Sequence, residues 1–455
     1  MKTVLKYHAI KVNIDKCIGC THCMKACPTE AIRIRKGKAD ISDNRCVDCG
    51  NCLRACPVDA FYVEHDEFEQ LKTFPHRVLL FPAVMIGQFA AKYSEDQIYQ
   101  ACLNLGFNHV LEVEQPIGWM IEMLRTEVQK KDVTPKISSF CPAIVRLIQI
   151  KYPSLAGNIV PFHAPHDLAA HYIISQLAKE GIERSQIGIF YVSPCSAKLA
   201  AVKRPFGDKP TMVDGLINMN DLYNRIMKQM RSQETTDTSH LRKNITIDGT
   251  LWSLPRGEAR EFKNRSMAID GIHNVVKFLE RLETEEVPDL DFLELKSCSQ
   301  GCAGGILLTG NRFLTVERLK KRAANYPTAA KLNFSDDCKE TVQQKMISGP
   351  ITPKPAFRLD TDRKKALLKM QKMDKILCQL PAIDCGGCGA PNCHALAEDM
   401  VQGKAKMTNC IFLQKRYLRD NKMDIGRVFK NLDKTWGANR IEADCSKKGG
   451  RNEGY

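Results

Sequence analysis

The residues of this sequence best suited to chemistry are its 20 cysteines, many of which have the spacing of metal ligands. Eight of them form an internal repeat, Cys17-x2-Cys20-x2-Cys23-x3-Cys27-Pro and Cys46-x2-Cys49-x2-Cys52-x3-Cys56-Pro. Each run places three thiols on one loop and a fourth after a short helix, which suits a [4Fe-4S] cluster. Paired Cys-x2-Cys also binds zinc. The third cysteine and the Cys-Pro ending, repeated twice, favour clusters.

This repeat resembles the bacterial two-cluster ferredoxins, in which the fourth cysteine of each run ligates the other cluster. The resemblance implies one cluster on Cys17, Cys20, Cys23 and Cys56, and another on Cys46, Cys49, Cys52 and Cys27. We therefore predict a two-cluster ferredoxin domain over residues 1–70, with short strands at 31–34 and 60–63.

Four further cysteines are far apart in the sequence but share one local setting: Cys141, Cys195, Cys298 and Cys302. The first precedes an amphipathic helix predicted for residues 142–152, and the second follows an apolar strand predicted for 187–192. The last two follow the apolar run that begins at Leu293. Because such loops gather at one crevice of an open α/β sheet, these thiols could ligate a single [4Fe-4S] cluster.

The elements that must position these thiols alternate between short apolar strands and longer amphipathic helices from Phe74 onward. This alternation predicts an α/β fold of parallel sheets with helices on both faces. We predict this central domain over residues 71–312. A helical connector over 313–375, a small iron-sulfur domain over 376–435 and a flexible tail over 436–455 follow it.

The three central loops resemble those of the catalytic domain of [FeFe]-hydrogenases, which carry Cys-Pro, Pro-Cys-x2-Lys and Cys-x3-Cys in this order. The resemblance covers about residues 77–310. It implies an H-cluster, in which the cubane is joined through Cys302 to a di-iron unit that bears CO and cyanide. It also implies that Lys198 binds a cyanide ligand. The expected chemistry is the interconversion of H2 with protons and electrons.

Several positions depart from the family pattern. Phe140 stands where the family has a proton-carrying cysteine, and Ser193 and Lys296 stand where it has methionines. His166 replaces a glutamine, and is either a proton donor or a satisfied loop histidine. Glu258 is a further candidate proton donor, although loop carboxylates are usually solvated. Because Phe140 has no proton to give, we expect slow turnover, as in a sensory, group-D-like branch of the family.

An alternative interpretation stays open. The chain could be a non-catalytic electron-transfer or redox-sensing protein that keeps the [4Fe-4S] cluster and lacks the di-iron unit. Lys198 and the intact Cys302 loop favour the enzyme. The alternative is favoured by the residues that depart from the family pattern, which are Phe140, Ser193, Lys296, Ala201 (where the family has a glutamate) and Ala83 (where it has a serine).

A third metal unit is predicted near the C-terminus, with the spacing Cys385-x2-Cys388-x4-Cys393-x16-Cys410. Three of its thiols lie on a glycine-rich loop, and a helix predicted for 394–406 returns the fourth. It resembles the four-cysteine [4Fe-4S] module of corrinoid iron-sulfur proteins and of the sensory hydrogenase branch, while zinc remains an alternative. Cys378 is a less well spaced alternative ligand. Cys102 is expected to be a core thiol, and we assign no role to Cys338 or Cys445.

The formal net charge is +15, but four oxidised [4Fe-4S] clusters with their thiolates would contribute roughly −8. We therefore predict no nucleic-acid partner. The remaining charge suits acidic electron carriers such as ferredoxin. No nicotinamide or flavin fingerprint is evident, so NAD(P) or flavin chemistry would belong to partner subunits. Residues 1–14 lack a signal-peptide core, and the longest apolar run, 78–91, is too short to insert in a membrane. We expect the cytoplasm of a low-oxygen cell.

Overall fold

The structure is a computed structural model that describes residues 7–207, 209–230, 236–284, 289–328 and 344–438. Cys338, Cys445 and nearly all of the predicted tail lie outside the described residues. Internal contacts divide the chain into two units. The first unit comprises residues 1–10, 47–50 and 63–355, and the second comprises 11–46, 51–62 and 356–455. The second unit thus combines most of the ferredoxin repeat with the C-terminal region.

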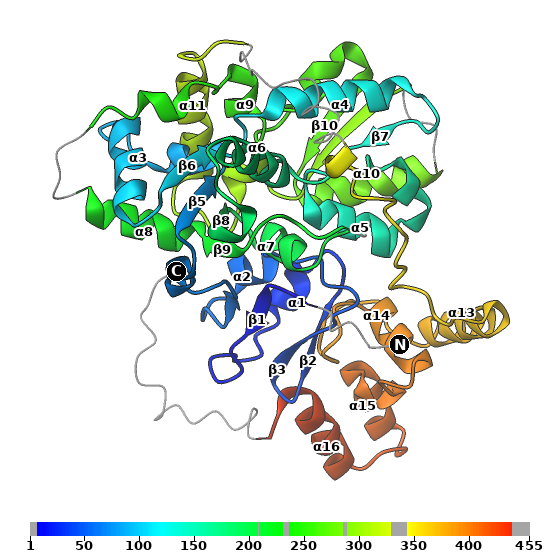
Figure 1. The fold of residues 1–455 in the computed structure, drawn as a ribbon. Coiled ribbons are helices and arrows are strands. Elements are labelled where there is room, and N and C mark those ends of the chain that lie inside the picture. The colour runs from blue at the N-terminus through cyan, green and yellow to red at the C-terminus, as the bar shows by residue number, and fades with distance from the viewer. Residues whose placement is uncertain (1–6, 208, 231–235, 285–288, 329–343, 439–455) are drawn as a thin grey trace. The chain divides into compact units, whose positions relative to one another are not determined.

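The first unit contains a parallel four-stranded sheet of order β6-β5-β8-β9 (Figure 1). Its strands are β5 (His76–Phe81), β6 (His109–Glu112), β8 (Ile187–Ser193) and β9 (Gly215–Asn218). Every residue of β8 is buried, as expected for a central strand of a parallel sheet with both faces covered. The parallel pairing confirms the predicted α/β class.

A second parallel sheet has the order β10-β11-β7, from β10 (Ser266–Asp270), β11 (Phe292–Lys296) and β7 (Lys136–Ile137). Phe292 is paired with Lys136, and Leu293 with Ile137. Because β7 and β11 are parallel neighbours, the loops that follow them leave the same edge of the sheet. These are the loops that carry Cys141 and Cys298.

Helices surround both sheets (Figure 1). They are α3 (Glu95–Asn104), α4 (Ile117–Gln129), α5 (Pro142–Lys151), α6 (Pro165–Lys179), α7 (Ser196–Lys203), α8 (Met219–Gln229), α9 (Ile247–Leu251), α10 (Ile272–Thr284) and α11 (Arg312–Ala323). The local sequence determines where several helices begin. Ser94 and Gln97 form a capping box at the start of α3, and α5 and α6 each begin with a proline. The helix predicted for 142–152 is confirmed as α5.

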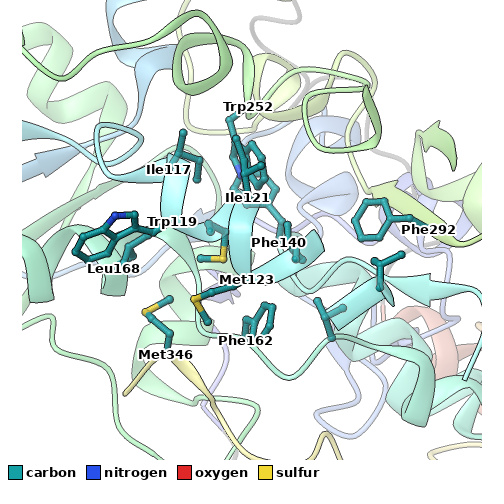
Figure 2. Packing of buried hydrophobic residues seen from close by; sticks show 14 residues of the cluster. Ile117, Trp119, Ile121, Met123, Phe140, Phe162, Leu168, Trp252, Phe292 and Met346 are labelled. Carbon is teal, nitrogen blue, oxygen red and sulfur yellow. The ribbon is translucent and has the colours of Figure 1, made fainter. Parts of the chain in front are cut away.

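Aromatic and sulfur side chains fill the core beside the second sheet (Figure 2). Trp119, Met123 and Trp252 belong to this cluster, and so does Phe140 from the first cysteine loop. The partly buried Cys302 packs against the cluster. The apolar core of the unit therefore reaches directly into the region of the central cysteines.

Helix α11 is fixed to the first sheet by a buried ion-pair network. The Arg322 guanidinium donates to Glu112 Oε2 at 2.7 Å and to Glu95 Oε2 at 2.7 Å. Arg322 and Glu112 are both buried. Loss of either partner would leave a buried charge uncompensated, which typically costs about 3–5 kcal/mol. The polar sequence after Gly310 thus begins with a helix, α11, that belongs to the first unit and packs against its first sheet.

The second unit consists of short strands and helices. They are β1 (Ile10–Val12), β2 (Ile32–Arg35), β3 (Lys38–Ile41), β4 (Phe61–Val63), α1 (His22–Ala26), α2 (Asn51–Ala55), α13 (Arg363–Leu377), α14 (Cys393–Val401), α15 (Ile411–Arg419) and α16 (Ile425–Trp436). β2 and β3 form an antiparallel hairpin. The helix predicted for 394–406 is too long, because α14 ends at Val401 and Gly403 turns the chain with a φ of +76°.

Within the described ranges, none of the helices has the length and apolarity that a bilayer crossing requires.

Candidate metal centre

The four central cysteines predicted as ligands line one cavity of the first unit, together with Lys198, Lys296 and Phe140. Backbone contacts join the three loops. Ser297 N lies 3.4 Å from Cys141 Sγ, which links the third loop to the first. Leu307 N donates to Pro194 O at 3.1 Å, which links the third loop to the second. The structure therefore brings together residues that are up to 161 positions apart.

Each cysteine has a local reason for its place. Cys141 and Cys195 are the N-cap residues of α5 and α7. The third loop turns sharply at Gln300 and Gly301, which have φ values of +68° and +59°. A Cβ at Gly301 would lie 2.4 Å from Ser253 O, so only glycine allows this approach. Cys302 N then donates to the same carbonyl at 2.9 Å.

Two of the four thiols, Cys195 and Cys302, lie in surroundings that oppose their ionisation unless a cation is added. Burial, with the neighbouring Cys302, raises the pKa of Cys195 to about 12, and Lys198 opposes this rise. Burial also raises the pKa of Cys302, against the effects of Lys198 and Lys296. Iron would supply the missing positive charge, since a coordinating thiol is deprotonated. The donor set and its burial therefore fit an iron-sulfur cube.

Two buried lysines flank the Phe140 ring. Lys198 Nζ lies 3.7 Å from the ring centroid and Lys296 Nζ lies 5.3 Å from it. Lys296 is neutralised by Glu294 Oε1 at 2.8 Å, and it donates to Leu254 O at 2.6 Å. Lys198 is different: among the described residues it takes part in no ion pair, and it is only 5 % exposed. A buried ammonium with a ring as its close partner is suited to an anionic ligand.

The Glu294 partner of Lys296 is a functional residue that sequence reasoning missed. The alternating run Leu293-Glu294-Leu295-Lys296 contained a signal for it, because residues i and i+2 of a strand share a face. β11 forms there, and both charged residues are buried on that face. Glu294 also accepts hydrogen bonds from the backbone N of Glu258 and Ala259, each at 2.8 Å.

Ser193 and His166 do not line the central cavity. Ser193 Oγ donates to Cys195 O at 2.8 Å and accepts from Cys195 N at 3.4 Å, so it shapes the cysteine turn. His166 stacks on Tyr191 with a centroid distance of 4.4 Å and lines a second cavity with His163 and Asp167. Burial lowers the pKa of His166, with Lys198 adding to the effect, so the ring stays neutral.

Glu258 is buried rather than solvated, contrary to the usual behaviour of loop carboxylates. It accepts from Ser138 Oγ at 2.6 Å, and Ser138 Oγ in turn accepts from Phe140 N at 3.1 Å. Burial raises the pKa of Glu258, although Lys296 opposes the shift. The carboxyl is therefore placed one side chain away from the first cysteine loop and can hold a proton.

A loop of the ferredoxin repeat belongs to the first unit and reaches the same cavity. Cys49 is among its lining residues. The preceding Asp48 is fully buried, and accepts from Arg146 Nη1 at 2.6 Å and from His8 Nδ1 at 2.8 Å. Its backbone O accepts from Ser196 Oγ at 2.6 Å, beside Cys195. No sequence spacing predicts this approach of Cys49 to the central thiols.

In the second unit, the first predicted ferredoxin set is brought together. Burial raises the pKa of Cys23 to about 12, and Cys20, Cys17 and Cys56 add to the rise as near neighbours. The repeat is also visible in its hydrogen bonds, since Ala31 N approaches Cys27 Sγ at 3.2 Å and Ala60 N approaches Cys56 Sγ at 3.3 Å. For the second set, Cys27, Cys46 and Cys52 belong to the second unit and Cys49 to the first. The ligation of that set stays a prediction.

The C-terminal cysteines also gather in the second unit. Burial raises the pKa of Cys388 to about 11, with Cys410 and Cys385 adding to the rise. Cys410 caps α15 and has Cys393 as a further neighbour. By contrast, Cys378 lies exposed at the end of α13, and Cys102 is a buried thiol on α3 as expected.

Comparisons with known proteins agree with this arrangement. The model of the iron-only hydrogenase large subunit, C-terminal domain, matches residues 78–252. A 4Fe-4S dicluster domain matches residues 16–60, and the "Putative Fe-S cluster" model matches residues 380–412. No curated protein matches the sequence.

Two solved structures illustrate the likeness. The [FeFe]-hydrogenase HydA1 from Chlamydomonas reinhardtii, as a variant, is 14% identical over 64% of this chain and 98% of its own, with a TM-score of 0.47. The HydA(deltaEFG) structure, titled for stepwise H-cluster assembly, is 16% identical over 63% of this chain and 95% of its own, with a TM-score of 0.45. The assignment rests on the family models. Residues 78–252 are therefore similar to the iron-only hydrogenase large subunit, C-terminal domain, and residues 16–60 to a 4Fe-4S dicluster domain.

Proposed function

We propose that the central cysteines hold an H-cluster, with a [4Fe-4S] cube on Cys141, Cys195, Cys298 and Cys302 and a di-iron unit joined through Cys302. The observation that supports it most is Lys198, a buried cation without an ion-pair partner among the described residues, in the wall of the four-cysteine cavity. An anionic group, such as a cyanide ligand, would satisfy it. When bound, the cofactor supplies the heterolytic splitting and formation of H2.

The residues around the cavity suit slow rather than fast proton delivery. Phe140 places an aromatic ring close to both lysines and has no exchangeable proton on its side chain. Lys296 holds its protons against Glu294 and a backbone carbonyl. Glu258 holds a proton beside Ser138 but is separated from the cavity by that side chain. A barrier higher by only about 3 kcal/mol would slow turnover roughly a hundredfold, which suits a sensor or a tuned subunit of a larger redox complex.

Electrons would reach the central cube through the loop of residues 47–50. Cys49, a predicted ligand of the second ferredoxin cluster, lines the cavity of the central thiols. Arg146 and Ser196 fix this loop through Asp48. Here a ligand of one cluster lies close to a second cluster, in a rigid loop from which water is excluded. Such an arrangement favours electron transfer, because the protein and solvent need to reorganise little when the electron moves.

A second function is favoured by Phe140 itself. Its ring is 6 % exposed and belongs to the apolar core (Figure 2), so it occupies space beside the lysines. If that space excludes a di-iron unit, the chain transfers electrons or senses redox state through its clusters alone.

Infrared spectra separate the two functions. Protein matured with the di-iron unit should show CO and cyanide stretching bands if the first function is right. Iron and inorganic sulfide should be measured on the same sample. Four clusters would give about sixteen irons per chain, and the di-iron unit would add two. Sixteen irons without the bands would support electron transfer alone, and fewer clusters would contradict both functions as stated.

A further inference from the structure

In the second unit, the C-terminal cysteine loop lies directly against the first ferredoxin cysteine loop. A Cβ built at Gly386, between Cys385 and Cys388, would lie 3.1 Å from Met24 Cε. Met24 follows Cys23 and is fully buried. The Met24 side chain therefore brings the two loops into contact, and each loop carries predicted cluster ligands.

The surrounding contacts fix this approach. Ile34 N donates to Gly389 O at 2.8 Å, and a Cβ at Gly389 would lie 2.3 Å from Ile34 O. Arg33 Nε donates to Asp399 Oδ2 at 2.8 Å, and both residues are buried. Backbone bonds from Lys36 N and Gly37 N also tie the hairpin to the end of α16. The C-terminal cysteines are thus an extension of the ferredoxin fold within this unit.

One face of this extension is a hollow of about 290 Å³, and Cys388 forms part of its wall. Its lining includes four exposed lysines, Lys36, Lys404, Lys406 and Lys434. Among the described residues none of the four takes part in an ion pair. The hollow has one carboxylate, Asp399, which is already paired with Arg33. The wall beside a predicted cluster ligand therefore carries a clear positive excess.

We propose that this hollow is the docking site of an acidic ferredoxin, and that electrons enter the chain there. The docked carrier gives up one electron and the C-terminal cluster gains it. That cluster then passes the electron to the cluster on Cys17, Cys20, Cys23 and Cys56 through the Met24 contact. This order gives one linear path, with the C-terminal cluster before the ferredoxin clusters. It rests on the iron-sulfur part of the proposed function and not on the di-iron unit.

Charge complementarity identifies the occupant. Four lysines that form no ion pair with any described residue attract an acidic protein from a distance, which raises the rate of encounter and makes that rate depend on salt. Cys388 in the wall brings the cluster close to the surface of whatever docks. A small polyanion would meet the same charge, but only an electron carrier makes use of a cluster at this place.

The test follows reduction of the clusters in the full, cluster-loaded chain by stopped-flow absorbance. A plant-type [2Fe-2S] ferredoxin, reduced beforehand, serves as the acidic carrier, and H2 is not measured. The triple variant K404E/K406E/K434E should lower the second-order rate constant at least tenfold at low salt. Reduction by photoreduced 5-deazariboflavin, which is uncharged, should not change. High salt should bring the rates of the native chain and the variant together.

The matched control is K364E/K372E/K422E, which makes the same charge change at exposed lysines of the second unit outside the hollow. It should change the rate less than threefold. Equal losses in both triple variants, or no loss in the first, would overturn the proposal. Inhibition of the native chain by micromolar pyrophosphate would show that the hollow binds small anions, which also overturns it. Because the readout is cluster reduction, these outcomes do not depend on whether the di-iron unit is bound.

Discussion

The central cysteine cavity and the C-terminal cysteine loop both have lysines nearby, but these lysines are buried at the first and exposed at the second. At the central cavity, Lys198 is 5 % exposed and Lys296 is 3 % exposed, and the cysteines are enclosed with them. At the C-terminal loop, Cys385 is exposed and the lysines of the hollow are exposed. A buried ammonium must be balanced by a bound anion or a carboxylate, whereas an exposed one is solvated. In the functions we propose, the first arrangement holds a cofactor and the second attracts a partner.

Removal of one central ligand gives the largest expected effect. The variant Cys302→Ala should lose the central cluster, so iron per chain should fall by about four, and the di-iron unit should no longer bind. The reason is that three thiols in an apolar cavity leave one iron without its protein ligand. Iron analysis of the purified chain measures this. The variant Cys102→Ala removes a buried thiol from α3 and should keep its iron. Equal iron in the native chain and Cys302→Ala would contradict a cluster at this place.

The second-largest effect is expected when the C-terminal cysteine loop is detached from the ferredoxin hairpin. In Asp399→Asn, the buried Arg33 loses its carboxylate partner, which typically costs about 3–5 kcal/mol. We expect amide hydrogen exchange in α14 and at Ile34 to become about a hundredfold faster or more. Exchange in β8 of the first unit should stay the same.

The control for that variant is Asp360→Asn, which removes the ion pair of Asp360 with the partly exposed Lys369. Exchange in α14 should change little, because solvated pairs contribute little to stability. If both variants behave alike, the Arg33 pair does not hold the two loops together.

A proton donor introduced at the central cavity should have a smaller effect. The variant Phe140→Cys places a thiol near Lys198 and Lys296 and should raise H2 evolution about tenfold. Phe140→Val creates a cavity of similar size but gives no proton, and it is the matched control for the loss of packing. Gas chromatography of H2 from reduced protein measures both. Equal rates in the two variants would mean that proton delivery is not limited at residue 140.

The smallest effect should be a shift in potential at the central cluster. Lys198→Met removes a positive charge beside the thiolates, so the reduced and more negative cluster is stabilised less. Its midpoint potential should fall by about 50 mV, on the order of a tenfold change in equilibrium constant for one electron. Lys198→Arg keeps the charge and should stay near the native value. A redox titration monitored by EPR measures the midpoint potential. An unchanged potential in Lys198→Met would show that the lysine is not close to the cluster.

The comparison of the two sites also shows where sequence patterns are informative. The ferredoxin runs and the C-terminal set are local, because most of their cysteines lie within about twenty residues of one another. The central set was predictable from apolar strands that end just before Cys195 and Cys298, since parallel strands deliver their loops to one edge. The surroundings of His166 could not be predicted from such a pattern. Its position after a proline indicated a loop, but tertiary packing buried it against Tyr191 and lined a different cavity with it.

The sequence by itself determined the cysteine groups, the α/β class and the strands and helices that carry the central thiols. Spacing and periodicity are properties of nearby residues, so they survive without knowledge of the fold. Only the tertiary structure decided that Glu258 is buried and that Cys49 and Met24 are contact points between loops. It also decided that Glu294 neutralises Lys296, whereas Lys198 has no such partner among the residues that the structure describes. Each of these depends on which distant segments pack together, and packing is set by the whole core rather than by any local pattern.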